Sequence, residues 1–283
     1  MSPRPRPLNP PYLYSGGTRR LADFVTECVP EYFGQYVEPF LGGGAVAIGL
    51  MERFPGAGFR LSSDDAELIV TWQVLATDVD RLVRLIGDHR DRHDRAHRSA
   101  VEALDDSSTG GTRLESLSPL ERAARFVYLQ GSAGSLGGSG SAGGAGRAGS
   151  SGRAGRDSRE EVAFDQANLR GVSRLLQNRD VSFRRAQPYS IVADVAEEDL
   201  VYFDPPFAGK GPEFERETRS LVNTLTARGA YLLAPGGGVA GGAVPYEGWK
   251  TMTVIADRGD GEQLWANGTL GRARRRWLGQ ADS

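Results

Sequence analysis

One short stretch, LVYFDPPF from Leu200 to Phe207, constrains the fold of this chain more than any other. Its four leading apolar residues predict a strand buried on both faces, and the two prolines that follow cannot continue such a strand. The strand must therefore stop at Asp204, which places a carboxylate and an aromatic ring at the carboxyl end of a strand. Open α/β sheets bind their ligands at that edge. For this stretch alone, a rigid turn without a function is the alternative interpretation.

A glycine-rich segment near the amino terminus predicts the first unit of a doubly wound sheet. Gln35 to Phe40 is typical of a short strand, and Leu41 to Met51 of a glycine turn that opens a buried helix. Phe59 to Asp65 predicts a second strand ending in acidic residues, followed by one helix from Ala66 to Leu85. This order suits a crevice that binds a nucleoside.

The rest of the chain predicts further strands and a long insertion. Further strands are expected near Asp180–Phe183, at Ala230–Leu233, and as an antiparallel pair at Lys250–Ala256 and Glu262–Ala266. About 160 residues separate Gly42 from Asp204, whereas one strand-helix-strand unit needs only about 30. We therefore expect an insertion between the second and third strands. The expected division of the chain is 12–86 and 171–268 for the sheet domain, 87–170 for a helical insert with a flexible Gly/Ser-rich segment at 131–156, and 269–283 for a basic tail.

Composition and charge narrow the class of protein. The chain has 283 residues, 39% of them hydrophobic and 25% charged, as in an ordinary soluble globular protein. A single cysteine, Cys28, excludes an internal disulfide and suits a reducing compartment. The proline-rich start predicts neither a signal peptide nor a membrane anchor, so we expect a cytoplasmic protein. A net charge of -2 gives no global attraction to nucleic acid, which leaves local basic patches for that role.

Two polar clusters have both a functional and a plain interpretation. His89, His93 and His97 lie four residues apart, a spacing that can chelate a metal on one helix face. The charged residues around them favour a solvated helix instead, and we expect no metal site. The arginines between 272 and 276, next to Trp277, either contact phosphates or form a solvated terminus.

Three segments together resemble the Dam-like, alpha-class adenine-specific DNA methyltransferases. They are Tyr36–Val46, Ala66–Ile69 and Tyr202–Phe207, and the wider likeness runs from about residue 12 to 268 in the family's order. The resemblance implies a Rossmann-like methyltransferase fold with an inserted, mainly helical subdomain. It also implies S-adenosylmethionine as cofactor and methyl transfer to the N6 amine of an adenine that is flipped out of double-stranded DNA. The chain is identified as a divergent member of that family.

The resemblance also implies the roles of particular residues. The Asp204 carboxylate and the Pro205 carbonyl would accept the hydrogens of the amine, and Phe207 would stack on the flipped base. Glu38 would meet the ammonium group of the cofactor. The implied catalytic residues are Asp204, Pro205, Pro206 and Phe207. The implied cofactor-binding residues are Tyr14, Gly16, Gly17, Glu38, Pro39, Phe40, Gly42, Gly43, Gly44, Ser63, Asp64 and Asp204.

Several positions depart from the family's pattern. Leu13 and Thr18 stand where the family has lysines, and Ser63 stands where it has the acid that binds the ribose, with Asp64 displaced by one residue. Phe207 replaces the usual tyrosine. Two alternatives therefore stay open: a catalytically impaired relative that binds nucleic acid, and an amino-methyltransferase that acts on RNA or a protein amide. The expected partners are DNA and a cognate restriction endonuclease, and we expect a monomer that contacts no membrane.

Overall fold

The computed structural model describes residues 7–12, 19–93, 95–102, 114, 116–132, 164–207, 209–236, 246–258 and 263–277. The predicted cofactor residues Tyr14, Gly16 and Gly17, with the departures at Leu13 and Thr18, lie outside these ranges. The same holds for the predicted flexible segment from residue 133 onward.

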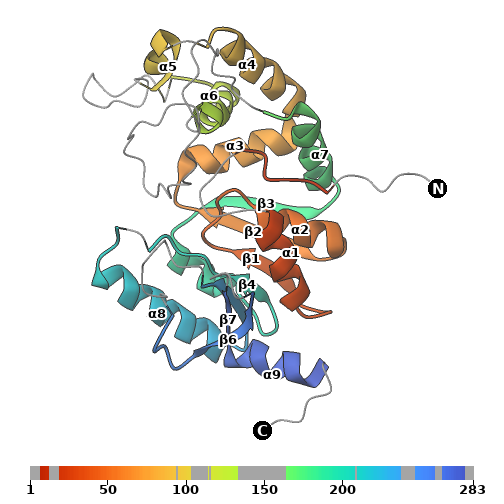
Figure 1. Ribbon diagram of the computed structural model, residues 1–283, viewed down its shortest axis with the longest axis vertical. Coiled ribbons are helices and arrows are strands. Elements are labelled where there is room, and N and C mark those ends of the chain that lie inside the picture. Colours follow the sequence, from red (N-terminus) through yellow and green to blue (C-terminus); the bar gives the residue numbers. More distant parts are fainter. Residues whose placement is uncertain are drawn as a thin grey trace, which may run out of the picture.

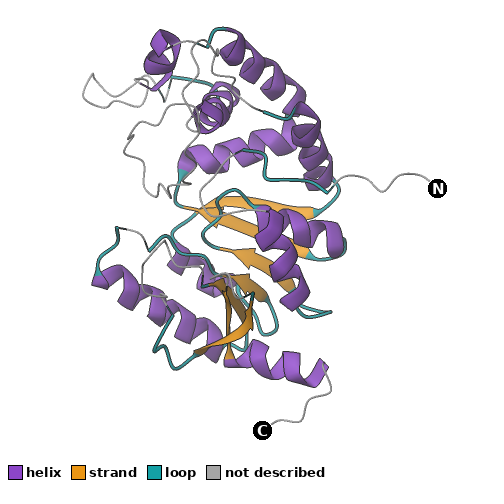
Figure 2. Cartoon of the chain, viewed as in Figure 1, coloured by secondary structure: helices purple, strands orange, loops and turns teal. Residues whose placement is uncertain are grey.

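The centre of the molecule is a seven-stranded sheet in the order β3-β2-β1-β4-β5-β7-β6 (Figures 1 and 2). Neighbouring strands from β3 to β5 run parallel, and β7 pairs antiparallel with both β5 and β6. This topology confirms the predicted doubly wound sheet and its closing antiparallel pair. The strands are β1 (Gln35–Glu38), β2 (Gly58–Ser63), β3 (Asp180–Arg185), β4 (Leu200–Tyr202), β5 (Tyr231–Pro235), β6 (Met252–Asp257) and β7 (Gln263–Asn267).

The central strands are buried on both faces, as their continuous apolar runs predict. Leu200 and Tyr202 of β4 belong to one hydrophobic core, whereas Val201 and Phe203 belong to a second core on the opposite face. β1 ends at Glu38 because Pro39 follows, two residues earlier than its predicted end at Phe40. Two cores therefore fix the position of the β4 end from above and below.

Helices cover both faces of the sheet (Figure 2). One core includes residues of α1, α2, α3, α4, α6, α7 and α9, and the other includes residues of α8 and the 3-10 helix η3. The bounds are α1 (Arg19–Cys28), α2 (Ala45–Arg53), α3 (Ala66–Thr77), α4 (Val79–Asp91), α5 (Arg95–Glu102), α6 (Pro119–Ser132), α7 (Gln166–Gln177), η3 (Pro188–Asp194), α8 (Pro212–Ala227) and α9 (Gly268–Trp277). In the described part of the chain, no helix is long and apolar enough to cross a membrane.

The single helix predicted from Ala66 to Leu85 is wrong, because the chain breaks at Asp78. That residue has φ of −145° and ψ of 47°, and its backbone N–H closes α3 by donating to Val74. Its carboxylate accepts a hydrogen bond from Arg81 in the first turn of α4 at 3.0 Å. Aspartate favours helix boundaries because its side chain competes for nearby hydrogen-bond donors. Two shorter helices therefore replace one long helix.

The connection between β2 and β3 carries α3 to α7, and the sequence predicts a helical insertion in this connection. Figure 1 shows α4, α5 and α6 at one end of the molecule, with α8 and α9 at the other. A charged pair joins α6 to α3: Nε and Nη2 of Arg122 on α6 donate to the Glu67 carboxylate on α3. Both side chains are largely shielded from solvent, so this pair fixes α6 beside α3. The exact boundaries of the insert stay a prediction.

The three histidines do not form the solvated helix face that we expected. α4 ends at Asp91, so the three residues do not share one helix, and their rings surround the buried Tyr128 of α6. His93 Nδ1 lies 2.7 Å from the Tyr128 hydroxyl, and His89 Nδ1 lies 3.1 Å from His97 Nε2. Among the described residues, no group of three or more His, Cys, Asp or Glu side chains could hold a metal ion. These histidines therefore pack α4 and α5 against α6.

The basic residues of α9 lie away from the end of β4. Trp277 at the end of α9 packs edge-on against Tyr231, which is the first residue of β5, with ring centroids 6.2 Å apart. Arg274 donates a hydrogen bond to the Ile255 carbonyl on β6 at 2.5 Å. Tyr231 marks the amino end of β5, whereas Asp204 lies beyond the carboxyl end of the parallel strand β4. The two residues are therefore at opposite ends of these strands.

Candidate active site

The predicted site lies where the order of the sheet reverses. β1 and β4 are neighbours, but the chain continues from β1 to β2 on one side and from β4 to β5 on the other. Helices that follow such strands diverge to opposite faces, which leaves a crevice at the carboxyl ends of the two strands. Glu38 is the last residue of β1, and Asp204 lies two residues beyond the end of β4. The structure therefore brings together two acids that are far apart in the sequence.

Glu38 is an acid buried at the end of β1. Its side chain is 4% exposed, and the Tyr36 hydroxyl donates a hydrogen bond to Oε2 at 2.8 Å. Burial raises the pKa of Glu38 to about 8; the Tyr36 hydrogen bond opposes this shift, and the charge of Asp204 adds to it. A cation placed beside the carboxyl would favour its ionised form. Glu38 is thus a carboxyl group prepared for a positively charged partner.

Asp204 is reachable by solvent, yet the surrounding protein still disfavours its charge. Desolvation raises the pKa of its carboxyl group to about 6, so the group is mostly ionised at neutral pH. Pro205 behind it is buried and Pro206 is exposed. The turn is closed by the backbone N–H of Phe207, which donates to the Pro205 carbonyl at 2.9 Å. The acid is therefore held on a rigid turn that faces solvent.

The glycine turn after β1 is held from two sides by aromatic side chains. The Gly42 carbonyl accepts hydrogen bonds from Trp72 Nε1 at 3.2 Å and from the Tyr12 hydroxyl at 3.3 Å. Gly44 has a φ of 66°, and a Cβ at that position would lie 2.6 Å from the Trp72 ring. Only glycine fits at position 44. Nothing in the sequence signals the support from Tyr12 and Trp72, since these contacts span 30 residues in each direction.

The acidic residues after β2 divide their roles. Ser63 ends the strand and is buried, with its hydroxyl accepting a hydrogen bond from the Asp65 backbone N–H at 3.3 Å. Asp65 caps α3 by accepting from Glu67 N and Leu68 N. Asp64 follows the last residue of β2 at a bend and is exposed, so the residue lies at the carboxyl end of the strand next to β1. Because β2 ends at Ser63, the alternation of side chains along the strand does not determine the direction of the Asp64 side chain.

Aromatic rings surround Phe207 in an arrangement that the sequence does not predict. Phe214 and Tyr246 each meet it edge-on with centroids 5.8 Å away, and Trp249 does so at 6.5 Å. The Tyr246 hydroxyl donates to the Phe203 carbonyl at 3.2 Å, next to Asp204. On the β1 side, Pro39 leads into Phe40, whose ring packs edge-on against Phe203 at 5.3 Å. These rings hold both turns of the site against the second core.

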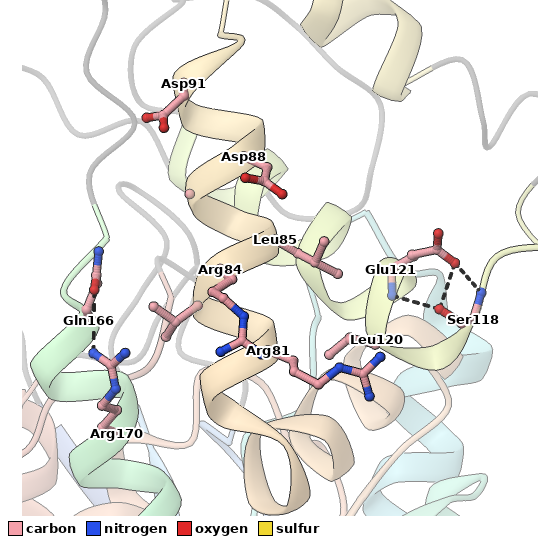
Figure 3. A pocket seen from close by; sticks show the side chains of 12 residues that line it. Arg81, Arg84, Leu85, Asp88, Asp91, Ser118, Leu120, Glu121, Gln166 and Arg170 are labelled. Carbon is pink, nitrogen blue, oxygen red and sulfur yellow. Dashed lines mark hydrogen bonds between the residues drawn. The ribbon is translucent and has the colours of Figure 1, made fainter.

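A groove on the surface lies apart from the predicted site residues. It has a volume of about 620 Å³ and lies between α4, α6 and α7 (Figure 3). Several of its polar side chains already have partners, since Arg170 pairs with Asp80 at 2.8 Å and Glu121 with Ser118 at 2.6 Å. None of the predicted site residues within the described ranges lines it. The candidate active site therefore lies at the carboxyl ends of β1, β2 and β4.

Comparison with known proteins assigns the class and then the family. The sheet order, the glycine turn after β1 and the acid turn after β4 are those of an α/β methyltransferase fold. Residues 14–216 match the model of the D12 class N6 adenine-specific DNA methyltransferases, and the chain belongs to this family. Membership implies adenine in DNA as the substrate and S-adenosylmethionine as the methyl donor.

Two relatives are themselves named as methyltransferases. The chain is 25% identical over 275 residues to the type II methyltransferase M.MjaIII of Methanocaldococcus jannaschii, covering 88% of this chain and 91% of the relative. It is 24% identical over 201 residues to the type II methyltransferase M1.LlaDCHI of Lactococcus lactis subsp. cremoris, covering 71% of this chain and 66% of the relative. The similarity therefore extends beyond the short motifs.

Replacing Gly44 by alanine tests the glycine turn. The new Cβ would meet the Trp72 ring and hold a strained φ, so we expect Gly44→Ala to lower the free energy of unfolding by about 1–3 kcal/mol. Urea denaturation measures this loss. Gly56→Ala is the control, because a Cβ at Gly56 meets nothing within 4 Å, and it should change stability little. Equal stability of the two variants would contradict the close approach of Trp72 to Gly44.

Replacing Glu38 by glutamine tests the buried acid. Because the folded state raises the pKa of Glu38 from 4.5 to about 8, it keeps a proton that the unfolded chain releases between these values. The protonated Glu38 carboxyl therefore contributes its full share to the free energy of unfolding below pH 4.5, and this share is lost as the pH rises toward 8. We expect Glu38→Gln to match the wild type at pH 5 and to exceed it by on the order of a few kcal/mol at pH 9. Parallel pH profiles in chemical denaturation would contradict this account, and Asp64→Asn is the control for an exposed acid.

Proposed function

We propose that this protein methylates the N6 amine of adenine in DNA at the edge formed by β1, β2 and β4, with S-adenosylmethionine as the donor. The observation that carries the proposal is the pairing, across neighbouring strands, of the buried Glu38 with the solvent-facing Asp204 turn. The buried Glu38 suits a cationic group of the cofactor. Asp204 suits the adenine amine, which must be reached from solvent. Family membership supports the same reaction.

The residues at the end of β1 would hold the cofactor, which supplies an electrophilic methyl group when bound. Glu38 would accept hydrogen bonds from its ammonium group, and the strand register places this carboxyl beside β4. The turn at Gly42, Gly43 and Gly44 leaves room for close backbone approach, since no side chain fits at Gly44. Asp64 or Ser63 would bind the ribose hydroxyls. Tyr14, Gly16 and Gly17 are proposed to complete the site.

The Asp204 turn would present the amine for attack. The Asp204 carboxylate and the second lone pair of the Pro205 carbonyl would accept the two amine hydrogens, which localises the nitrogen lone pair for attack on the methyl carbon. In the transfer, the bond from the methyl carbon to sulfur would be replaced by a bond to the amine nitrogen. The nitrogen would then carry a positive charge and would lose one of its two protons. Asp204 faces solvent and is positioned to pass that proton to water.

Phe207 would stack on the target base. The amine is unreachable inside the duplex, so the adenine must be flipped out of the helix. Phe214, Tyr246 and Trp249 meet the Phe207 ring edge-on and restrict its movement, which prepares one orientation of the ring for the base. We also propose that the protein acts as a monomer. We further propose that it serves a restriction system with a cognate endonuclease; its relatives are named type II methyltransferases. The cytoplasmic location stays a prediction.

Replacing Asp204 by asparagine tests the catalytic turn. At saturating S-adenosylmethionine, we expect Asp204→Asn to slow methyl transfer to duplex DNA by about a hundredfold or more. In the wild type, the ionised carboxylate is the active form and its pKa is raised to about 6, so the rate should fall as the pH drops through 6. Counting radiolabelled methyl groups in DNA measures both effects.

Asp91→Asn, which changes an exposed acid at the end of α4, is the control and should transfer at the wild-type rate. An Asp204→Asn variant that is as fast as the wild type would contradict the proposed role of this carboxylate. A wild type that binds cofactor but leaves all DNA unmethylated would favour the alternative substrates, RNA or a protein amide. A protein that binds DNA but not the cofactor would be a non-catalytic relative.

A further inference from the structure

A hydroxyl group next to the two site acids has no hydrogen-bond partner. Tyr202 is the last residue of β4 and is 3% exposed, and its hydroxyl oxygen is buried without a partner in the described part of the chain. Most buried polar groups are paired, because leaving one unpaired forfeits the hydrogen bonds that it made with water. An unpaired hydroxyl beside a ligand crevice therefore calls for a partner that arrives with the ligand.

The position of Tyr202 relative to Glu38 follows from the strand register. Val37 pairs with Val201, so the next residues along the parallel strands, Glu38 and Tyr202, are also neighbours. Tyr36 and Tyr202 belong to the same core, and Tyr36 reaches Glu38 with its hydroxyl. The register therefore places Tyr202 beside Glu38 at the carboxyl ends of the two strands. The charges of Asp204 and Glu38 both raise the pKa of the Tyr202 phenol, after the larger effect of burial.

Every group considered at the carboxyl ends of β1 and β4 can accept a hydrogen bond. They are the two carboxyl groups and the phenols of Tyr36 and Tyr202. No basic side chain is among the described charges that shift the pKa of Glu38, Tyr202 or Asp204. A primary ammonium group carries three N–H donors and a positive charge, and it matches such a set of acceptors. An anion such as a carboxylate or phosphate can accept from a phenol, but the ionised Asp204 carboxylate would repel it.

We infer that the Tyr202 hydroxyl is a further cofactor-binding group, which accepts a hydrogen bond from the α-ammonium group of S-adenosylmethionine beside Glu38. The inference rests on the proposed function, because it assigns a ligand within the same site. Tyr202 then has two roles: its ring fills the core under the sheet edge, and its hydroxyl receives the amino group.

Tyr202→Phe separates these two roles, because it keeps the ring and removes only the hydroxyl. In calorimetric titrations with S-adenosylmethionine, we expect the variant to bind about ten- to a hundredfold more weakly, the usual effect of a lost hydrogen bond to a charged group. With an analogue that lacks the α-amino group, the variant and the wild type should bind equally. Without any ligand, the variant should melt at or above the wild-type temperature, since the lost hydroxyl has no partner in the free protein.

Tyr231→Phe is the matched control, because Tyr231 lies on the neighbouring strand β5 and its hydroxyl bonds to Glu198 at 3.0 Å, away from the site acids. It should bind the cofactor as the wild type does. Unchanged affinity of Tyr202→Phe for S-adenosylmethionine would overturn the inference and leave the proposed function intact. A lowered melting temperature of the free variant would do the same, because it would mean that the hydroxyl has a partner in the free protein. Failure of the wild type to bind at millimolar cofactor would overturn the proposed function and the inference together.

Discussion

The organisation of the site depends on a carboxyl group buried at the end of the central strand β1. Burying an acid is costly, and burial raises the pKa of Glu38 to about 8, although the Tyr36 hydroxyl donates a hydrogen bond to it. A fold tolerates such a group where a ligand compensates for it. Residues that suffer this penalty in the free protein are therefore candidates for binding, and Glu38, Asp204 and Tyr202 all lie at the carboxyl ends of the neighbouring strands β1 and β4.

The sequence predicts the parts of this site that local chemistry determines. The apolar run before Asp204 and the prolines after it define where β4 stops, and glycine residues after Glu38 define the turn into α2. Both features act through neighbouring residues in the chain. In the structure, both turns lie at the carboxyl ends of the neighbouring strands β1 and β4, where the strand order reverses.

What the sequence could not predict depends on contacts between distant residues. Trp72 lies in an ordinary helical pattern, and only the fold brings its ring against Gly44. Tyr246 lies far along the chain from Phe207, although the two rings meet edge-on. Propensity predicts one continuous helix across Asp78, whereas the structure has two, α3 and α4, which both pack in the same core as α6.

A crystal structure of the protein soaked with S-adenosylmethionine tests the central claim most directly. We predict electron density at the carboxyl ends of β1 and β4, with the ammonium group within hydrogen-bond distance of Glu38 and the methyl group directed toward Asp204. Density in another place, such as the groove between α4, α6 and α7, would contradict this account. So would a cofactor that lies at the sheet edge with its carboxylate, instead of its ammonium group, beside Glu38.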